Sequence, residues 1–213
     1  MKGTSTYRPW IDQQLPSPFS EFVTRYYPVR EQALRYIDEH TFQVEIEKGG
    51  LLVKSGELCP NLYLVLKGVL RAYCENKRKQ ITTWITAENE LVTSIRSFDF
   101  QKPSVENIQA LEDCTLIAVS YQDLHHLYEN FMEMNIIARK ILEQYYREAE
   151  ERAFISRLTS ASEKYEHFLA TKWELHNRIP LKYIASYLGV TLETLSRIRG
   201  AKTVRKTNQE LSI

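Results

Sequence analysis

The chain has 213 residues, and 43% of them are hydrophobic, so it is long enough for two domains that each bury a core. A formal net charge of +1 excludes a chain that is strongly basic or acidic throughout. The charge is uneven, however: residues 155–213 contain 10 Lys and Arg against 5 Asp and Glu, and the preceding residues contain 18 against 22. A basic C-terminal segment on a slightly acidic body indicates a polyanion partner at that end.

Several functional classes lack their characteristic residues. No apolar run approaches the roughly 20 residues of a membrane-spanning helix, so we expect a cytoplasmic protein without a membrane partner. The three cysteines are widely spaced and form no C-x-x-C pair, which is typical of reduced structural thiols. His125 and His126 are adjacent and point about 100° apart on a helix, so they form no metal site. Because the sequence has no nucleophile elbow, P-loop or G-x-G-x-x-G, we expect no enzyme, no catalytic residue and no metal.

The N-terminal part changes from helical to strand patterning. Residues 1–18 contain three prolines and predict an irregular arm. Residues 19–40 predict two short helices, with Ser20 as a cap and Pro28 as the break between them. Short apolar runs separated by turn residues then fill residues 41–120. This close spacing predicts an all-β barrel or sandwich, interrupted between its later strands by a polar loop or short helix.

Beyond residue 120 the hydrophobic period becomes helical. Residues 120–130 predict a short helix, and residues 131–158 predict a long one of about 28 residues, or roughly 40 Å. The apolar stripe of the long helix either packs along the β-barrel or pairs with a second copy of the chain, and we expect pairing. The residues expected on this homodimer helix are Phe131, Met134, Ala138, Ile141 and Tyr145.

The C-terminal segment contains a predicted helix-turn-helix. A helix at residues 160–175 precedes it. Within residues 181–198 apolar side chains recur where two steeply crossing helices bury them, and Gly189 allows a left-handed turn between the helices. Thr191 suits the cap of the second helix, and Glu193 suits its first turn. In this basic segment, the second helix is expected to lie in the major groove of DNA.

The order of these elements resembles the Crp/Fnr superfamily of transcription regulators. VTLETLSRIR at residues 190–199 is similar to the family's recognition helix, and LLVKSGELCPNLYLVLKGVLRAY at residues 51–73 resembles its β-roll. The resemblance implies an α+β fold with a jelly-roll-type N-terminal β-roll and flanking helices in residues 1–129, a long dimerisation helix in 130–158, and a C-terminal winged helix-turn-helix domain in 159–213. It also implies a homodimer that binds palindromic double-stranded DNA and contacts RNA polymerase.

The resemblance assigns contacts to bases and to phosphates. Glu193 and Arg197 would contact base edges, because Arg bonds guanine bidentately and a carboxylate accepts from the cytosine amino group. Leu192 stands where the family commonly has Arg, and it would touch a thymine methyl. Ser196 has the identity found in the Fnr-like branch, which implies a TTGAT-type half-site. The expected DNA contacts are Thr191, Leu192, Glu193, Thr194, Ser196, Arg197, Arg199 and Lys202.

The sensor domain departs from the family's cyclic-AMP cassette, which carries Gly-Glu followed by Arg-Ser-Ala. Glu90 matches, but Asn89 replaces the Gly and Ser104 replaces the Arg that holds the phosphate. Loss of that charged pair costs about 1.5–3 kcal/mol, and Glu106 adds repulsion, so cyclic AMP is not the expected ligand. No cofactor is expected, since the first 58 residues lack the cysteines of an Fnr-type iron–sulfur cluster. With the effector unidentified, the candidate pocket residues are Glu90, Arg96, Ser104, Val105 and Asn107.

Two alternatives stay open at this point. In one, the β-roll is a small-molecule or protein-binding module, and the DNA-binding domain is vestigial; the short tail after Arg199 favours this, because it leaves little chain for a wing. In the other, the protein responds to a cyclic nucleotide whose phosphate Arg96 holds. Against the first alternative, Glu193, Ser196 and Arg197 retain the pattern of a base-reading helix.

Overall fold

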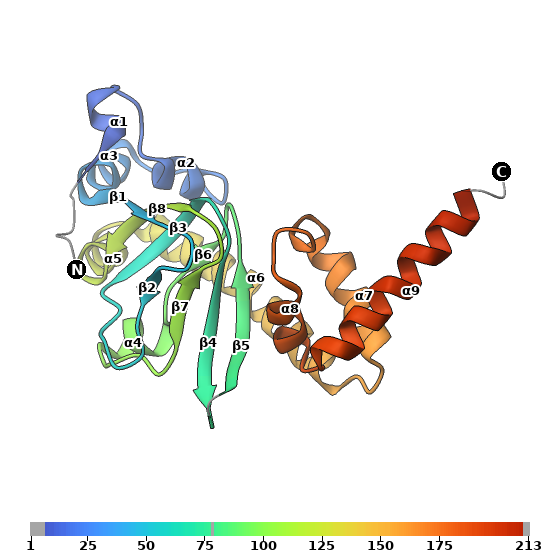
Figure 1. The fold of residues 1–213 in the computed structure, drawn as a ribbon. Helices are drawn as coiled ribbons and strands as arrows, with labels where there is room; N and C mark the ends of the chain where they lie inside the picture. Colours follow the sequence, from blue (N-terminus) through green and yellow to red (C-terminus); the bar gives the residue numbers. More distant parts are fainter. Residues whose placement is uncertain (1–6, 78, 211–213) are drawn as a thin grey trace.

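Two four-stranded antiparallel sheets form a β-roll in the computed structural model, which describes residues 7–77 and 79–210, with side chains through Ala201 (Figure 1). One sheet consists, in order, of β1 (Thr41–Ile46), β8 (Cys114–Ser120), β3 (Asn61–Lys67) and β6 (Leu91–Val92). The other consists of β2 (Leu51–Val53), β7 (Asn107–Ala110), β4 (Leu70–Asn76) and β5 (Lys79–Thr86). The all-β unit predicted for residues 41–120 is therefore confirmed.

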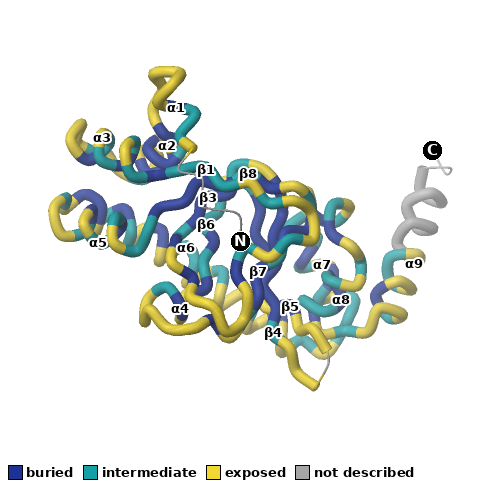
Figure 2. The backbone as a smooth tube through the Cα atoms, turned by 60° about the vertical axis from the view of Figure 1, so that its left-hand side comes forward, coloured by how far each residue is buried: buried dark blue, intermediate teal, exposed yellow. Residues whose placement is uncertain are grey.

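Apolar side chains from both sheets fill the interior of the roll. Val65, Leu70, Ile108 and Leu116 are fully buried there, and in Figure 2 the buried positions follow the strands. The turn between β3 and β4 depends on Gly68, whose φ is +106°. A Cβ at this position would lie 2.4 Å from the sulfur of Cys114, so the turn requires glycine for both its backbone conformation and its close contact.

Three short helices cover one end of the roll: α1 (Pro9–Asp12), α2 (Pro18–Thr24) and α3 (Glu31–His40). The break predicted at Pro28 is confirmed, but the prediction that Ser20 caps the first helix is wrong. Ser17 accepts the cap hydrogen bond from the Phe19 amide at 3.2 Å, because Pro18 already occupies the first helical position. The arm before it is also more ordered than expected, since Trp10 is buried.

The segment after the roll forms α5 (Tyr121–Asn130) and the long α6 (Met132–Arg157), while α4 (Ile95–Phe100) is the predicted insert between β6 and β7. Met134 and Ile141 of α6 are buried in the core that the roll shares with α2 and α5. Phe131 and Tyr145 pack against the same core, so the stripe predicted for self-pairing faces the chain's own roll. This corrects the expected role of these residues, because the roll offers the apolar surface that a second copy was expected to supply.

The C-terminal helices are α7 (Ala161–Lys172), a 3-10 turn (Trp173–Leu175), α8 (Leu181–Leu188) and α9 (Leu192–Glu210). Their core includes residues from the outer surface of the roll: Val69 and Ile85 are buried in one cluster with Phe168 and Leu188. Trp173, at the start of the 3-10 turn, is 54% exposed. Within the described residues, no helix is long and apolar enough to cross a membrane.

Candidate nucleic-acid interface and sensor site

The predicted helix-turn-helix forms from α8 and α9. Gly189 ends α8 with φ +66°, and the amide of Val190 donates to the Ala185 carbonyl at 3.0 Å, which turns the chain sharply. Thr191 then caps α9, because its Oγ1 accepts from the Thr194 amide at 3.2 Å. Leu195 is fully buried in the angle between the helices, as the spacing predicted.

The outer surface of the first turns of α9 carries the residues expected to read DNA. Thr191, Leu192, Glu193, Ser196 and Arg197 are all exposed, and Figure 1 shows α9 projecting away from the roll. Backbone hydrogen bonding at the start of the helix, with a further contribution from Thr191, lowers the pKa of Glu193. The carboxylate therefore stays charged at the positive end of the helix dipole.

The other three residues expected to contact DNA are Thr194, Arg199 and Lys202. Thr194 and Arg199 are partly exposed, and an Arg199 guanidinium nitrogen donates to Asn177 Oδ1 at 2.8 Å. The side chain of Lys202 lies outside the described residues. Helix α9 continues to Glu210, and in the described part of the chain no strand follows Ser120. The expected wing is thus replaced, over the described residues, by a helical extension.

Helix α8 is held on strands β4 and β5 by two kinds of contact. The Ser186 hydroxyl accepts from the Thr82 amide at 2.9 Å and donates to the Gln80 carbonyl at 3.0 Å. The guanidinium carbon of Arg71 lies 3.7 Å from the centroid of the Tyr183 ring. Because Arg71 is almost fully buried, this stacking joins the sheet to the helix in a site screened from water.

An ion-pair cluster adds a second connection between the roll and the C-terminal helices. Both terminal nitrogens of Arg178 donate to Glu88, at 2.9 and 2.6 Å, and one of them also pairs with Glu112. The Gly68 amide donates to Glu88 at 2.8 Å. The Arg178 hydrogen bonds outweigh desolvation and lower the pKa of Glu88 to about 2, while the pKa of Arg178 is raised. Sequence reasoning missed this cluster, because its members are far apart in the chain.

The candidate effector residues do not converge on one pocket. Glu90 lies at the domain junction, where it accepts from the Thr86 hydroxyl at 2.6 Å and pairs with Lys172 at 3.5 Å. Arg96 is exposed on α4, and Val105 is 62% exposed. The prediction that Glu90 and Ser104 line one site therefore finds no support in their contacts.

Ser104 and Asn107 are buried, but the loop around them uses their hydrogen-bonding groups. The Ser104 hydroxyl lies 2.9 Å from that of Ser94 and donates to the Glu106 carbonyl at 2.8 Å. The Asn107 side-chain oxygen accepts from the Ser55 amide at 3.0 Å. Ser94 was missed by sequence reasoning, because a lone serine at the start of a predicted loop carries no pattern.

The Glu106 carboxyl lies beside this serine pair and is hydrogen-bonded to Ser94. Burial raises the pKa of its carboxyl, and hydrogen bonds from Ser94, Trp84 and Thr83 partly oppose that rise. The carboxylate would repel the phosphate of a nucleotide in the same space, and within the described residues no Arg or Lys is hydrogen-bonded to this cluster.

The chain thus combines a β-roll, a long helix and a helix-turn-helix whose second helix is exposed. Residues 43–131 match the family described as "Cyclic nucleotide-binding domain". FixK2 from Bradyrhizobium japonicum is similar in fold, with a TM-score of 0.66 at 15% identity over 78% of this chain and 86% of its own.

Two further solved structures share the fold. A putative transcriptional regulator of the Crp/Fnr family from Eubacterium rectale has a TM-score of 0.66 at 16% identity, over 85% of this chain and 88% of its own. A CooA mutant from Carboxydothermus hydrogenoformans has a TM-score of 0.64 at 15% identity, over 95% of this chain and 86% of its own. No curated protein matches the chain. The chain therefore contains a cyclic nucleotide-binding-type domain and has the fold of the Crp/Fnr regulators.

Proposed function

We propose that this protein is a homodimeric, sequence-specific DNA-binding regulator that does not respond to cyclic AMP. The observation that carries the proposal is the exposed start of α9, which presents Glu193, Ser196 and Arg197 on one helical turn. These side chains have no packing role in the described structure, and their types suit base edges in the major groove. Thr194, Arg199 and Lys202 are proposed to hold the phosphate backbone.

The second copy is proposed to pack on the outer face of α6. This face carries Leu142, Tyr146, Ala149 and Ala153, all exposed and spaced alternately by four and three residues. Such spacing forms a seam in a two-helix coiled coil, and the two alanines allow a close approach. Leu142 and Tyr146 are each 66% exposed, so pairing would remove a large apolar area from water.

Pairing along α6 explains how two recognition helices would reach one palindrome. A dimer of this class places its recognition helices about 34 Å apart, which is one turn of DNA. A TTGAT-type half-site is proposed on the basis of Ser196, and RNA polymerase is proposed as the protein partner. Cyclic AMP is disfavoured because Glu106 lies beside the buried Ser94 and Ser104 where a phosphate would need a cation.

The test is selection of binding sites from randomised duplex DNA by the purified chain at fixed salt, with and without cyclic AMP. We expect a palindrome with half-sites one turn apart, enriched equally in both conditions. Fluorescence anisotropy on the selected duplex then compares Arg197→Ala with Arg35→Ala, an exposed Arg of α3 that serves as the control.

Arg197→Ala is expected to cost about 1–3 kcal/mol and to relax the preference at one base pair of each half-site. Arg35→Ala is expected to leave affinity unchanged. Enrichment only in the presence of cyclic AMP would show that the sensor binds the nucleotide. If no site is enriched in either condition, the DNA-reading proposal is wrong.

A further inference from the structure

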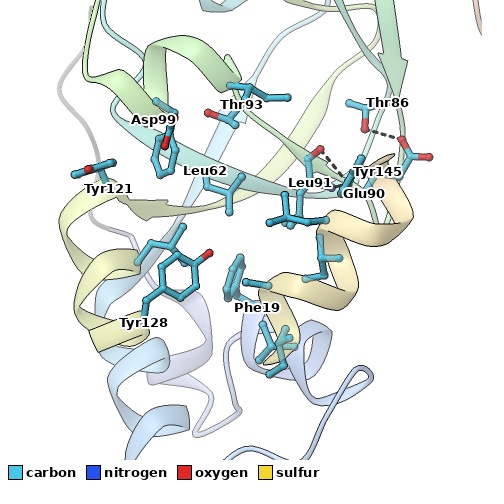
Figure 3. Close-up of a pocket in the computed structure, with 18 of the residues that line it drawn as sticks. Phe19, Leu62, Thr86, Glu90, Leu91, Thr93, Asp99, Tyr121, Tyr128 and Tyr145 are labelled. Atoms are coloured by element: carbon cyan, nitrogen blue, oxygen red, sulfur yellow. Dashed lines mark hydrogen bonds between the residues drawn. The ribbon is translucent and has the colours of Figure 1, made fainter. Parts of the chain in front are cut away.

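A cavity of about 550 Å³ lies between the roll and helices α4, α5 and α6 (Figure 3). Small-molecule sites commonly have volumes of about 300–1,000 Å³. Of the candidate effector residues named above, Glu90 lines this cavity, whereas Arg96, Ser104, Val105 and Asn107 do not, so the cavity overlaps the cassette compared with nucleotide binders at Glu90 alone. It also lies far along the chain from the proposed DNA-reading helix.

The walls of the cavity are largely apolar and aromatic. Leu62, Leu91, Phe98, Leu124, Ile137 and Ile141 supply much of the lining. The ring of Phe19, from α2, and the rings of Tyr121 and Tyr128, both from α5, face the same space (Figure 3). A flat aromatic molecule would gain both burial and edge or face contacts with these rings.

Polar groups without partners gather at one end of the cavity. Tyr121, His125 and Tyr128 are spaced by four and three residues, so they share one face of α5. Among the described residues, the Tyr128 hydroxyl and the His125 ring nitrogens have no hydrogen-bond partner, and the hydroxyl points into the open centre of the pocket (Figure 3). Burial raises the pKa of Tyr128 to about 12, so the phenol stays protonated and is able to donate.

Two other polar groups of the lining already have hydrogen-bond partners within the chain. The Tyr145 hydroxyl accepts from the Leu91 amide at 2.6 Å, and Glu90 accepts from the Thr86 hydroxyl. Carboxylates also outnumber cations around the cavity: Glu90, Asp99 and Glu148 line it together with a single Arg, Arg152. This balance disfavours an anionic ligand such as a fatty acid or a nucleotide.

We propose that this cavity binds an uncharged aromatic molecule with one hydrogen-bonding oxygen, of the phenol or quinone class, and that the Tyr128 hydroxyl donates to that oxygen. An apolar helix from a second copy is the competing occupant. It fits less well, because it would bury the Tyr128 hydroxyl and the His125 imidazole without partners.

The test uses 2-naphthol, which is uncharged at neutral pH, in calorimetric titration of the full chain. Two variants probe the cavity. Tyr128→Phe removes only the hydroxyl, and Ala138→Phe fills space from the α6 wall. Tyr27→Phe, an exposed tyrosine outside the cavity lining, is the matched control. Circular dichroism confirms that each variant is folded, and sodium decanoate serves as the anionic comparison ligand.

We expect one 2-naphthol per chain, about three- to tenfold weaker binding in Tyr128→Phe, and no binding in folded Ala138→Phe. Tyr27→Phe should bind like the parent chain, and decanoate should bind more weakly than 2-naphthol. Equal binding by Ala138→Phe would place the ligand elsewhere, and tighter binding of decanoate would contradict the ligand class. Binding that appears only in a monomeric Tyr146→Glu variant, whose changed side chain lies on the proposed α6 seam and outside the cavity lining, would show that a second copy fills the cavity, which also overturns the proposal. None of these readouts depends on DNA binding.

Discussion

Replacing Arg178 with Met removes the ion pairs that join the C-terminal helices to the roll, while keeping an apolar stem of similar length. The difference between an ordinary Glu pKa of 4.5 and the value of about 2 for Glu88 corresponds to about 3 kcal/mol at 1.36 kcal/mol for each tenfold change. The side chains of Arg178 and Glu88 are 32% and 30% exposed, so solvent screening reduces the expected contribution to about 1–2 kcal/mol.

Urea denaturation of the parent chain and Arg178→Met at pH 7 and pH 3 measures this contribution. Because the folded-state pKa of Glu88 is depressed, its stabilisation is fully present above about pH 4.5 and is lost as the pH falls towards 2. The difference between the two proteins should therefore be about 1–2 kcal/mol at pH 7 and clearly smaller at pH 3.

The exposed pair Arg35–Glu31 on α3 provides the control, since its side chains are 68% and 85% exposed. Arg35→Met should change the free energy of unfolding by less than about 0.5 kcal/mol at either pH. An Arg178→Met difference that is the same at pH 7 and pH 3 would refute the assignment of the stabilisation to the Glu88 charge.

Three further changes have expected outcomes. Gly68→Ala should lower the free energy of unfolding by about 2 kcal/mol or more in urea denaturation, because the new Cβ would meet the Cys114 sulfur and because φ is positive at this position. A decrease of less than about 0.5 kcal/mol would contradict this reasoning. Thr191→Ala should cost about 1 kcal/mol in thermal unfolding through loss of the α9 cap, and Thr191→Ser should restore most of it. Leu142→Glu should convert the proposed dimer to monomer in sedimentation, whereas Leu15→Glu should not, because Leu15 is also exposed but lies on the N-terminal arm. A dimer that survives Leu142→Glu would exclude the α6 seam.

The helix-turn-helix was predictable because its determinants are local. The left-handed turn at Gly189 and the cap at Thr191 depend on residues within a few positions of each other, and both are confirmed. The strands of the roll were predictable for the same reason, since alternation and turn residues are short-range signals. The cap at Ser17 was missed because Ser17 and Ser20 each lie two residues before a phenylalanine, and only Pro18 distinguishes them.

The partner of the α6 stripe was not predictable. The helix has two apolar faces, an inner one with Met134 and Ile141 and an outer one with Leu142 and Tyr146, and periodicity alone does not say what each face contacts. The surroundings of Glu90 were not predictable for a related reason. Glu90 pairs with Lys172, which lies far along the chain, and no local sequence pattern encodes that contact.

The core that Val69 and Ile85 of the roll share with Phe168 and Leu188 makes this chain a poor candidate for dissection. A fragment that begins at residue 159 would expose the apolar surface that the roll now covers, and the roll alone would expose the complementary patch. Hydrogen exchange should therefore show amides on both sides of this junction opening together. Any signal that reorients α9 relative to the roll has to slide or open a packed apolar layer, so it would proceed as a switch between two discrete packings.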